Sequence, residues 1–145
     1  MPKCILIADD SKTIRTLIRA FIENRAGFEV CGEASTGTET LQKCVELKPD
    51  VLVKDWVMPG MDSIELTRQI SRLSPDTAIV IFSFYDMPEL IVAAKAAGVH
   101  RVATKNISSL IAVIEDVLRS PSNRLIGPSE SVTQPSVDPA KDNLE

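Results

Sequence analysis

The sequence predicts a doubly wound α/β domain, in which helices cover both faces of a parallel sheet. Short, continuous apolar segments alternate along the chain with longer segments whose apolar residues recur every three or four positions. These are the patterns of buried strands and of amphipathic helices. Hydrophobic residues make up 44% of the chain and aromatic residues only 4%, so the core is expected to be aliphatic.

Five strands and five helices are expected in alternation. The strand-like segments are residues 4–8, 28–32, 51–53, 78–82 and 99–103, and the helical segments are residues 14–22, 36–47, 64–73, 86–97 and 110–118. Asp10 or Ser11 is expected to cap the first helix, and Ser108 or Ser109 the last. Right-handed crossovers between parallel strands leave few topologies. The order 2-1-3-4-5 fits five such units, so the expected fold is flavodoxin-like.

The chain is expected to hold one folded domain, residues 1–119. The remaining 26 residues contain four of the nine prolines and show no periodic apolar pattern. Such a composition cannot bury a core of its own. Residues 120–145 are therefore expected to be a disordered tail or an interdomain linker.

Composition also excludes several functions for this domain. The net charge of −4 argues against binding to nucleic acid. Acidic residues interrupt the first apolar segment, so no signal peptide is expected, and the uncharged segment 78–85 is too short to span a membrane. Cys4, Cys31 and Cys44 have no C-x-x-C spacing and are interpreted as small buried hydrophobic residues in a reducing compartment. The expected location is the cytoplasm.

Polar side chains stand where four of the expected strands end. Asp9 and Asp10 follow the first strand, Asp55 follows the third, Ser83 closes the fourth and Lys105 follows the fifth. Each has an ordinary interpretation by itself, as a helix cap, a turn residue, a strand end or a solvated charge. In a parallel sheet, however, all four strand ends lie at one edge, which is where open α/β sheets bind ligands.

Three neighbouring carboxylates repel one another, and a hard divalent cation relieves that repulsion. Mg²⁺ is the expected ion, because it takes one or two carboxylates and fills its remaining positions with water and phosphate oxygens. Asp10 and Asp55 are expected to bind it directly, Asp9 through water, and the backbone carbonyl of Val57 completes the metal site. Asp55 would then accept a phosphoryl group, with Lys105 and Ser83 contacting its oxygens.

The sequence lacks the motifs of other phosphate-binding sites and of histidine zinc sites. Neither G-x-x-x-x-G-K-[ST] nor G-x-G-x-x-G occurs in the sequence. His100 is the only histidine, so no histidine zinc site is expected, and it is interpreted as an exposed strand residue.

With these residues in place, the chain resembles the receiver domains of two-component response regulators over residues 3–119. Residues 5–11 resemble the family's first strand and acid pair, and residues 49–62 its phosphoacceptor segment. Ser83 falls at the family's switch hydroxyl and Lys105 at its lysine. Residues 30–37, together with Ser108 shortly after Lys105, are similar to the subgroup that carries LuxR-type helix-turn-helix outputs.

The resemblance implies a phosphorylation-dependent signalling switch. A sensor histidine kinase, or a small phosphodonor, would phosphorylate Asp55 with Mg²⁺ and shift the face formed by the fourth helix, the fifth strand and the fifth helix. The domain would catalyse only its own phosphotransfer and dephosphorylation. Its implied partners are the kinase, a DNA-binding output domain beyond residue 145 or a separate output protein, and a second copy of the chain on phosphorylation.

Five residues depart from the family pattern. Lys54 places a charge before the acceptor, Ser63 replaces the usual glycine after Asp62, and Phe84 follows the switch hydroxyl in place of a small residue. Val102 and Asn106 replace the usual aromatic residue and proline. Two alternatives therefore stay open: a pseudo-receiver that binds a partner without phosphorylation, and a Mg²⁺-dependent phosphohydrolase with an aspartyl nucleophile.

Overall fold

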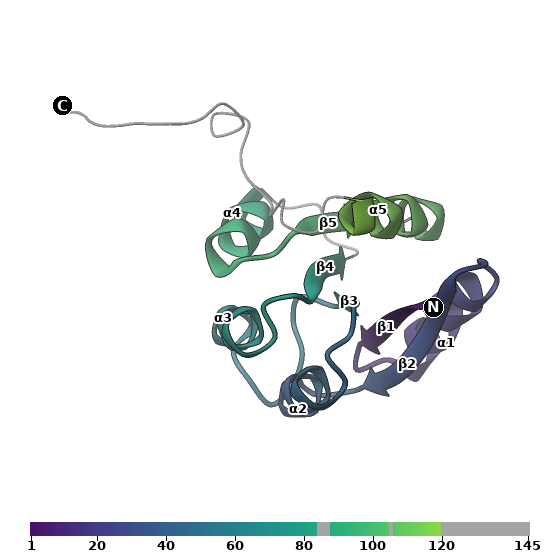
Figure 1. Ribbon diagram of the computed structural model, residues 1–145. Coiled ribbons are helices and arrows are strands. Elements are labelled where there is room, and N and C mark those ends of the chain that lie inside the picture. Colours follow the sequence, from purple (N-terminus) through teal and green to yellow (C-terminus); the bar gives the residue numbers. More distant parts are fainter. Residues whose placement is uncertain (84–87, 105, 120–145) are drawn as a thin grey trace, which may run out of the picture.

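The computed structural model describes residues 1–83, 88–104 and 106–119 (Figure 1). Its strands and helices alternate as β1 (Lys3–Ala8), α1 (Lys12–Glu23), β2 (Phe28–Ala34), α2 (Gly37–Leu47), β3 (Val51–Lys54), α3 (Ser63–Leu73), β4 (Ala78–Ser83), α4 (Pro88–Ala97), β5 (Arg101–Thr104) and α5 (Ile107–Arg119). The predicted alternation is confirmed. Residues 84–87 (including Phe84 and Tyr85), Lys105 and residues 120–145 lie outside the described residues, so the expected domain boundary stays a prediction.

The five strands form one sheet in the order β2-β1-β3-β4-β5, as predicted. Every neighbouring pair is parallel. Val53 of the central strand aligns with Ile7 on one side and with Val80 on the other. All the strands therefore end at the same edge of the sheet.

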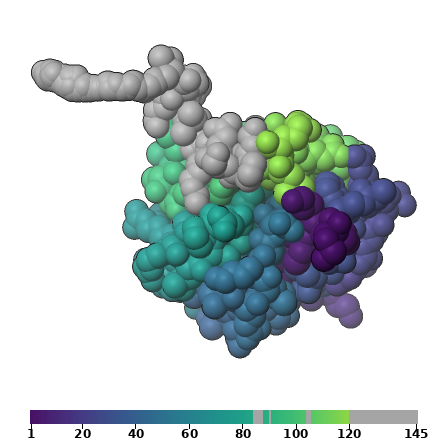
Figure 2. All heavy atoms as spheres, in the orientation of Figure 1, coloured from purple at the N-terminus to yellow at the C-terminus, as the bar shows by residue number. Residues whose placement is uncertain are grey.

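Helices cover both faces of the sheet, and each face has its own aliphatic core. Helices α1 and α5 pack on one face, and α2, α3 and α4 pack on the other (Figure 1). Alternate residues of each strand serve the two cores: Ile5 and Ile7 face α1 and α5, whereas Leu6 and Ala8 face α2 and α3. Figure 2 shows the start of the chain, in dark purple, at the surface beside the yellow-green residues of α5.

The fifth strand begins two residues later than predicted, because the preceding residues close α4. Gly98 adopts a positive φ of 106°, and the amide of Val99 donates back to the carbonyl of Ala94 at 3.0 Å. His100 is buried, with 2% exposure, and its Nδ1 accepts the amide of Ile79 at 3.0 Å. The interpretation of His100 as an exposed strand residue was therefore wrong: its imidazole is a hydrogen-bonding part of the core.

The cap of the last helix also differs from the prediction. The Asn106 side-chain oxygen accepts the amides of Ser108 and Ser109, at 2.9 and 3.4 Å. Helix α5 thus begins at Ile107, and Asn106 supplies the acceptor expected from a serine. At the first helix the cap is Ser11, one of the two predicted candidates, which accepts the amide of Ile14 at 3.3 Å.

The interpretation of the three cysteines was wrong for two of them. Cys4 and Cys31 form a disulfide between β1 and β2, whereas Cys44 is free and buried. The pairing register passes from Ile5–Val30 to Leu6–Gly32, so Cys31 is the extra residue of a β-bulge. A bulge turns a side chain away from the regular alternation, and a strand pattern read from the sequence cannot show this.

Within the described part of the chain, the helices are all too short or too polar to cross a lipid bilayer.

Candidate functional site

Three aspartates meet where β1 and β3 end. Asp9 and Asp10 directly follow β1, and Asp55 directly follows β3, its neighbour in the sheet. Backbone hydrogen bonds extend the sheet to these residues: the Asp9 amide donates to Ala34 and the Asp55 amide to Ala8, both at 3.0 Å. Carboxylate oxygens of the three aspartates all lie within 4.8 Å of one another. The predicted acid cluster is therefore present.

Burial and mutual repulsion make the cluster a poor host for three negative charges. Burial, with the charges of Asp55 and Asp10, raises the pKa of Asp9 to about 6, against the lowering effect of the Ser11 amide, which donates to Asp9 Oδ1 at 2.8 Å. Burial also raises the pKa of Asp55, opposed by the Trp56 amide and the charge of Lys54. A bound cation would therefore stabilise the ionised form of these carboxylates.

The donor set fits a small, hard divalent cation. All three side chains offer carboxylate oxygens, which Mg²⁺ prefers. Asp9 is buried, Asp55 is half-buried and Asp10 is exposed, so one side of the cluster is open to the water that Mg²⁺ retains. Val57, the fourth predicted ligand, lies two residues beyond Asp55 and is 68% exposed. Its role as a carbonyl ligand stays a prediction.

The loop that follows Asp55 is held against the start of α2. The Gly37 amide donates to the Pro59 carbonyl at 2.8 Å. A Cβ atom on Gly37 would stand 2.8 Å from that of Met61, so only glycine permits this approach. Gly60 turns the loop with a φ of 94°, and Asp62 then caps α3 by accepting the Glu65 amide at 3.0 Å. The acceptor segment is therefore anchored at both ends.

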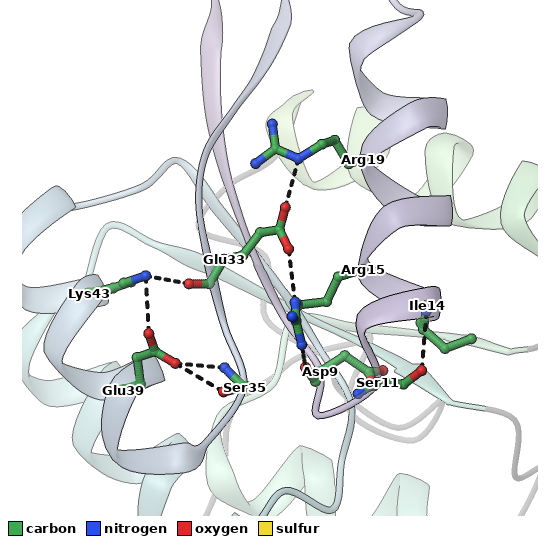
Figure 3. A network of polar contacts seen from close by, with 9 residues as sticks. All are labelled: Asp9, Ser11, Ile14, Arg15, Arg19, Glu33, Ser35, Glu39 and Lys43. Atoms are coloured by element: carbon green, nitrogen blue, oxygen red, sulfur yellow. Dashed lines mark hydrogen bonds and ion pairs between the residues drawn. The ribbon is translucent and has the colours of Figure 1, made fainter.

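A polar network that the sequence analysis did not predict ties α1 to the acid pair (Figure 3). Arg15 Nη1 donates to the backbone carbonyl of Asp9 at 2.7 Å, and Arg15 Nε pairs with Glu33 of β2 at 2.8 Å. Arg19, one turn further along α1, binds the other Glu33 oxygen at 2.7 Å. Burial alone would raise the pKa of Glu33, but the two guanidinium groups hold it below its usual value. The only sequence signal is the four-residue spacing of the arginines.

The sequence shows Lys54 as a departure from the family pattern, but it does not show that the side chain is buried. Its side chain is wholly buried, and its Nζ donates to the carbonyl of Asp55 at 2.6 Å and lies 3.4 Å from that of Trp56. Burial lowers the pKa of Lys54 to about 8, although the charges of Asp55 and Asp9 act to raise it. Nothing in the local sequence distinguishes such a lysine from one at a strand edge.

The remaining predicted residues are only partly placed. Ser83 is buried at the end of β4, where it aligns with Thr104 of β5. Val102 is half-buried in β5 and packs against the core beneath α2, α3 and α4. Lys105 lies outside the described residues, directly after β5. The structure thus brings Asp9, Asp10 and Asp55 together, whereas the approach of Ser83 and Lys105 to them stays a prediction.

The strand order of the sheet and the acid cluster at the ends of β1 and β3 together define the class of protein to which this chain belongs. The family model of the response regulator receiver domain matches residues 5–115. The chain therefore belongs to the receiver domain family of two-component response regulators.

Particular relatives agree with this assignment. The transcriptional regulatory protein LiaR of Bacillus subtilis is 40% identical over 119 residues, which cover 81% of this chain and 55% of LiaR. The chemotaxis protein CheY of Thermotoga maritima is 36% identical over 98 residues, which cover 68% of this chain and 81% of CheY. The chain thus spans about half the length of LiaR and most of CheY.

Solved structures show the same fold. A two-component response regulator of the LuxR family from Aurantimonas sp. SI85-9A1 superposes with a TM-score of 0.78 at 28% identity, covering 90% of this chain and 94% of that one. A CheY-like receiver domain protein from Methanospirillum hungatei JF-1 gives 0.76 at 27% identity, covering 84% and 98%. The predicted likeness to LuxR-type regulators is confirmed.

Proposed function

We propose that this domain is a phosphorylation-dependent signalling switch whose phosphoacceptor is Asp55. The observation that carries the proposal is the position of Asp55 at the end of the central strand, with its carboxylate grouped with those of Asp9 and Asp10. Membership of the receiver family supports it. The carboxylate of Asp55 is half-buried, so a phosphodonor can reach it. The residue directly follows β3, which is a rigid element of the sheet.

In the proposed reaction an oxygen of the Asp55 carboxylate attacks the phosphorus of a phosphohistidine or of a small acyl phosphate. The bond from phosphorus to the donor's nitrogen or oxygen breaks as the new bond to Asp55 forms. A Mg²⁺ ion bound by Asp10 and Asp55, with Asp9 acting through water, would neutralise charge on the phosphoryl oxygens. The Trp56 amide holds Asp55 Oδ1 at 2.8 Å, which leaves the other carboxylate oxygen as the nucleophile.

Once attached, the phosphoryl group would be held by two further side chains. Lys105, just beyond β5, supplies a positive charge, and Ser83, at the end of β4, supplies a hydroxyl donor. Ser83 ends β4, which lies on the far side of β3 from β1, and Lys105 follows β5 in the sequence. Recruitment of these residues would shift α4, β5 and α5 between two packings, and this face would carry the signal.

The partners follow from this proposal. A sensor histidine kinase would supply the phosphoryl group to this domain in the cytoplasm. Because the chain spans about half the length of LiaR, residues 120–145 would link the receiver to a DNA-binding output domain. A separate output protein, or a second phosphorylated copy, is the alternative partner. The receiver domain itself would bind neither nucleic acid nor membrane.

The experiment is incubation with a small phosphodonor, such as acetyl phosphate, followed by intact mass spectrometry. The wild type with Mg²⁺ should gain one phosphoryl group, and the same protein in EDTA should gain none. Asp55→Asn, which keeps the size and one oxygen of the side chain, is the matched variant and should stay unmodified.

The same experiment separates the alternatives. A wild type that takes no phosphoryl group from either the acyl phosphate or a kinase would be a pseudo-receiver. Continuous release of phosphate from a phosphate ester would indicate a phosphohydrolase. Stoichiometric labelling with slow loss supports the switch.

A further inference from the structure

A buried ammonium group lies directly beneath the acceptor loop. Lys54 ends β3, aligned between Ala8 and Ile81 of the neighbouring strands, and no part of it is exposed. Withdrawing an ammonium from water is costly unless strong acceptors replace its hydration. The acceptors here are the backbone carbonyls of Asp55 and Trp56, at 2.6 and 3.4 Å from Nζ. Nζ also lies 5.5 Å from the centroid of the Trp56 ring, within range of a cation–π attraction.

One peptide unit connects this ammonium to the acceptor carboxylate. Lys54 binds the carbonyl oxygen of the peptide between Asp55 and Trp56. The N–H of that same peptide donates to Asp55 Oδ1 at 2.8 Å. Because a peptide is planar, fixing its carbonyl also fixes its N–H. The positive charge on the carbonyl further polarises the N–H towards the carboxylate.

Ser63, at the start of α3, binds the same loop. Its hydroxyl donates to the carbonyl of Trp56, the second carbonyl that faces Lys54. Ser63 is itself fixed as the first residue of α3, where its own carbonyl accepts the hydroxyl of Thr67 at 2.9 Å. In the sequence, Lys54 and Ser63 are two separate departures from the family pattern, and the structure joins them at one oxygen atom.

We propose that Lys54 and Ser63 are positioning residues for phosphoryl acceptance, which hold the Asp55–Trp56 backbone so that the Asp55 carboxylate faces the donor. This inference rests on the proposed function of Asp55 and adds two residues to it. A nucleophile held in one orientation reacts faster than one that must be ordered in each encounter.

The two residues differ in their effect on a metal ion. The charge of Lys54 acts on Asp55 and Asp9, so it also opposes the approach of Mg²⁺ to these carboxylates. Ser63 is neutral. Removing Lys54 should therefore slow phosphoryl transfer and at the same time tighten Mg²⁺ binding. A variant that merely loosened the cluster would be slower and would also bind Mg²⁺ more weakly.

The test compares Lys54→Met, Ser63→Ala and the double variant with the wild type. Lys48→Met is the matched control, because Lys48 also donates to a backbone carbonyl, that of Leu73 at 2.8 Å, but at the exposed far end of α2. Calorimetry measures the dissociation constant for Mg²⁺ alone, and circular dichroism checks the fold. Intact mass spectrometry measures the rate of labelling by acetyl phosphate at saturating Mg²⁺.

We expect Lys54→Met to be labelled about tenfold more slowly and Ser63→Ala about fivefold more slowly, as for the loss of a charged and a neutral hydrogen bond. Lys54→Met should bind Mg²⁺ about threefold more tightly. The double variant should be within about twofold of Lys54→Met, because both residues act on one carbonyl. Lys48→Met should match the wild type in both measurements.

Labelling of Lys54→Met and Ser63→Ala within about twofold of the wild type would overturn the proposal, as would weaker Mg²⁺ binding by Lys54→Met. If Lys54→Met does not fold, the rate of Ser63→Ala decides. If the wild type itself takes no phosphoryl group, the proposed function fails, and the Mg²⁺ affinity of Lys54→Met still decides whether Lys54 acts on the cluster.

Discussion

Arg15 of α1 donates from its Nη1 atom to the backbone carbonyl of Asp9 at 2.7 Å. Through this bond the first helix supports the loop that carries the acid pair, and the Arg15–Glu33 ion pair fastens the same side chain to β2. A side chain that acts on the backbone in this way leaves the carboxylates free for a cation.

The first prediction concerns this contact. Arg15→Met should lower the free energy of unfolding by about 1 kcal/mol, because the side chain is largely buried and both its bonds are lost. It should also weaken Mg²⁺ binding by about threefold, since the Asp9 loop loses its support. Urea unfolding and calorimetry measure the two effects.

Arg19→Met is the matched control for Arg15→Met. Arg19 also pairs with Glu33, but its other bond reaches Glu23, on the more exposed part of the network. It should leave Mg²⁺ affinity unchanged. Equal loss of Mg²⁺ affinity in both variants would show that Glu33, and not the Asp9 carbonyl, transmits the effect.

The second prediction concerns the pH dependence of the metal-free protein. The pKa of Asp9 is raised from 3.8 to about 6, so the folded state binds this proton more tightly than the unfolded state does. The stability that protonation of Asp9 contributes is therefore fully present below about pH 4, and it is lost as the pH rises through about 6. Asp9→Asn, which removes the charge and keeps the oxygen that accepts the Ser11 amide, should not show this loss.

In EDTA at pH 7.5, Asp9→Asn should thus be more stable than the wild type by up to about 3 kcal/mol. At pH 4 the two proteins should differ little. Urea unfolding across this pH range measures the difference. A wild type that is the more stable protein at pH 7.5 without metal would contradict the raised pKa of Asp9.

The third prediction concerns the disulfide. Cys4 and Cys31 are separated by 27 residues, and opening a loop of this length should lower the free energy of unfolding by about 3 to 4 kcal/mol. Burial raises the pKa of the Cys44 thiol to about 12, so this cysteine should not react in the folded state.

Alkylation followed by intact mass spectrometry checks this arrangement. The native protein should take up no alkyl group before reduction and two after mild reduction, on Cys4 and Cys31. The Cys4→Ser and Cys31→Ser double variant should have the unfolding free energy of the reduced wild type. Two reactive thiols in protein that has never been reduced would show that the bond does not form in solution.

The fourth prediction concerns the lifetime of the phosphoryl group. Val57 is two residues past Asp55 and largely exposed, and its side chain cannot hydrogen-bond the water needed for hydrolysis. Val57→Asn should therefore speed loss of the phosphoryl group about fivefold, the value of one such hydrogen bond. After the phosphodonor has been removed, intact mass spectrometry measures the phosphorylated fraction over time. Val45→Asn, on the exposed side of α2, is the control and should decay as the wild type does.

The fold was predictable because its strands are short apolar segments and its helices keep a regular apolar spacing. The site followed from topology: parallel strands put Asp9, Asp10 and Asp55 at one edge even though Asp55 lies 45 positions after Asp10 in the sequence. The bulge at Cys31, the burial of His100 and the cap at Asn106 did not follow. The first two depend on backbone groups of a distant or irregular segment, which carry no sequence signal. The cap at Asn106 is local, and asparagine is a preferred N-cap residue, so the sequence offered it beside the two serines.

Lys54 shows the same limit within the site. Its charge was visible in the sequence, but its acceptors are carbonyls of its own loop, which any residues would supply. Ser63 became informative only when the structure placed its hydroxyl on one of those carbonyls. Arg15 likewise reads as a surface residue of α1 until Asp9 is seen beside it.

The position of the phosphoryl group in the phosphorylated chain tests most directly whether Asp55 is the acceptor. Borohydride reduces an aspartyl phosphate to homoserine, so treatment of the phosphorylated chain marks the acceptor permanently, and peptide mass spectrometry then locates it. We expect homoserine at residue 55 alone, and none in protein incubated with the donor without Mg²⁺ or in Asp55→Asn. Homoserine at residue 9 or 10, or labelled protein that yields no homoserine, would contradict Asp55 as the acceptor.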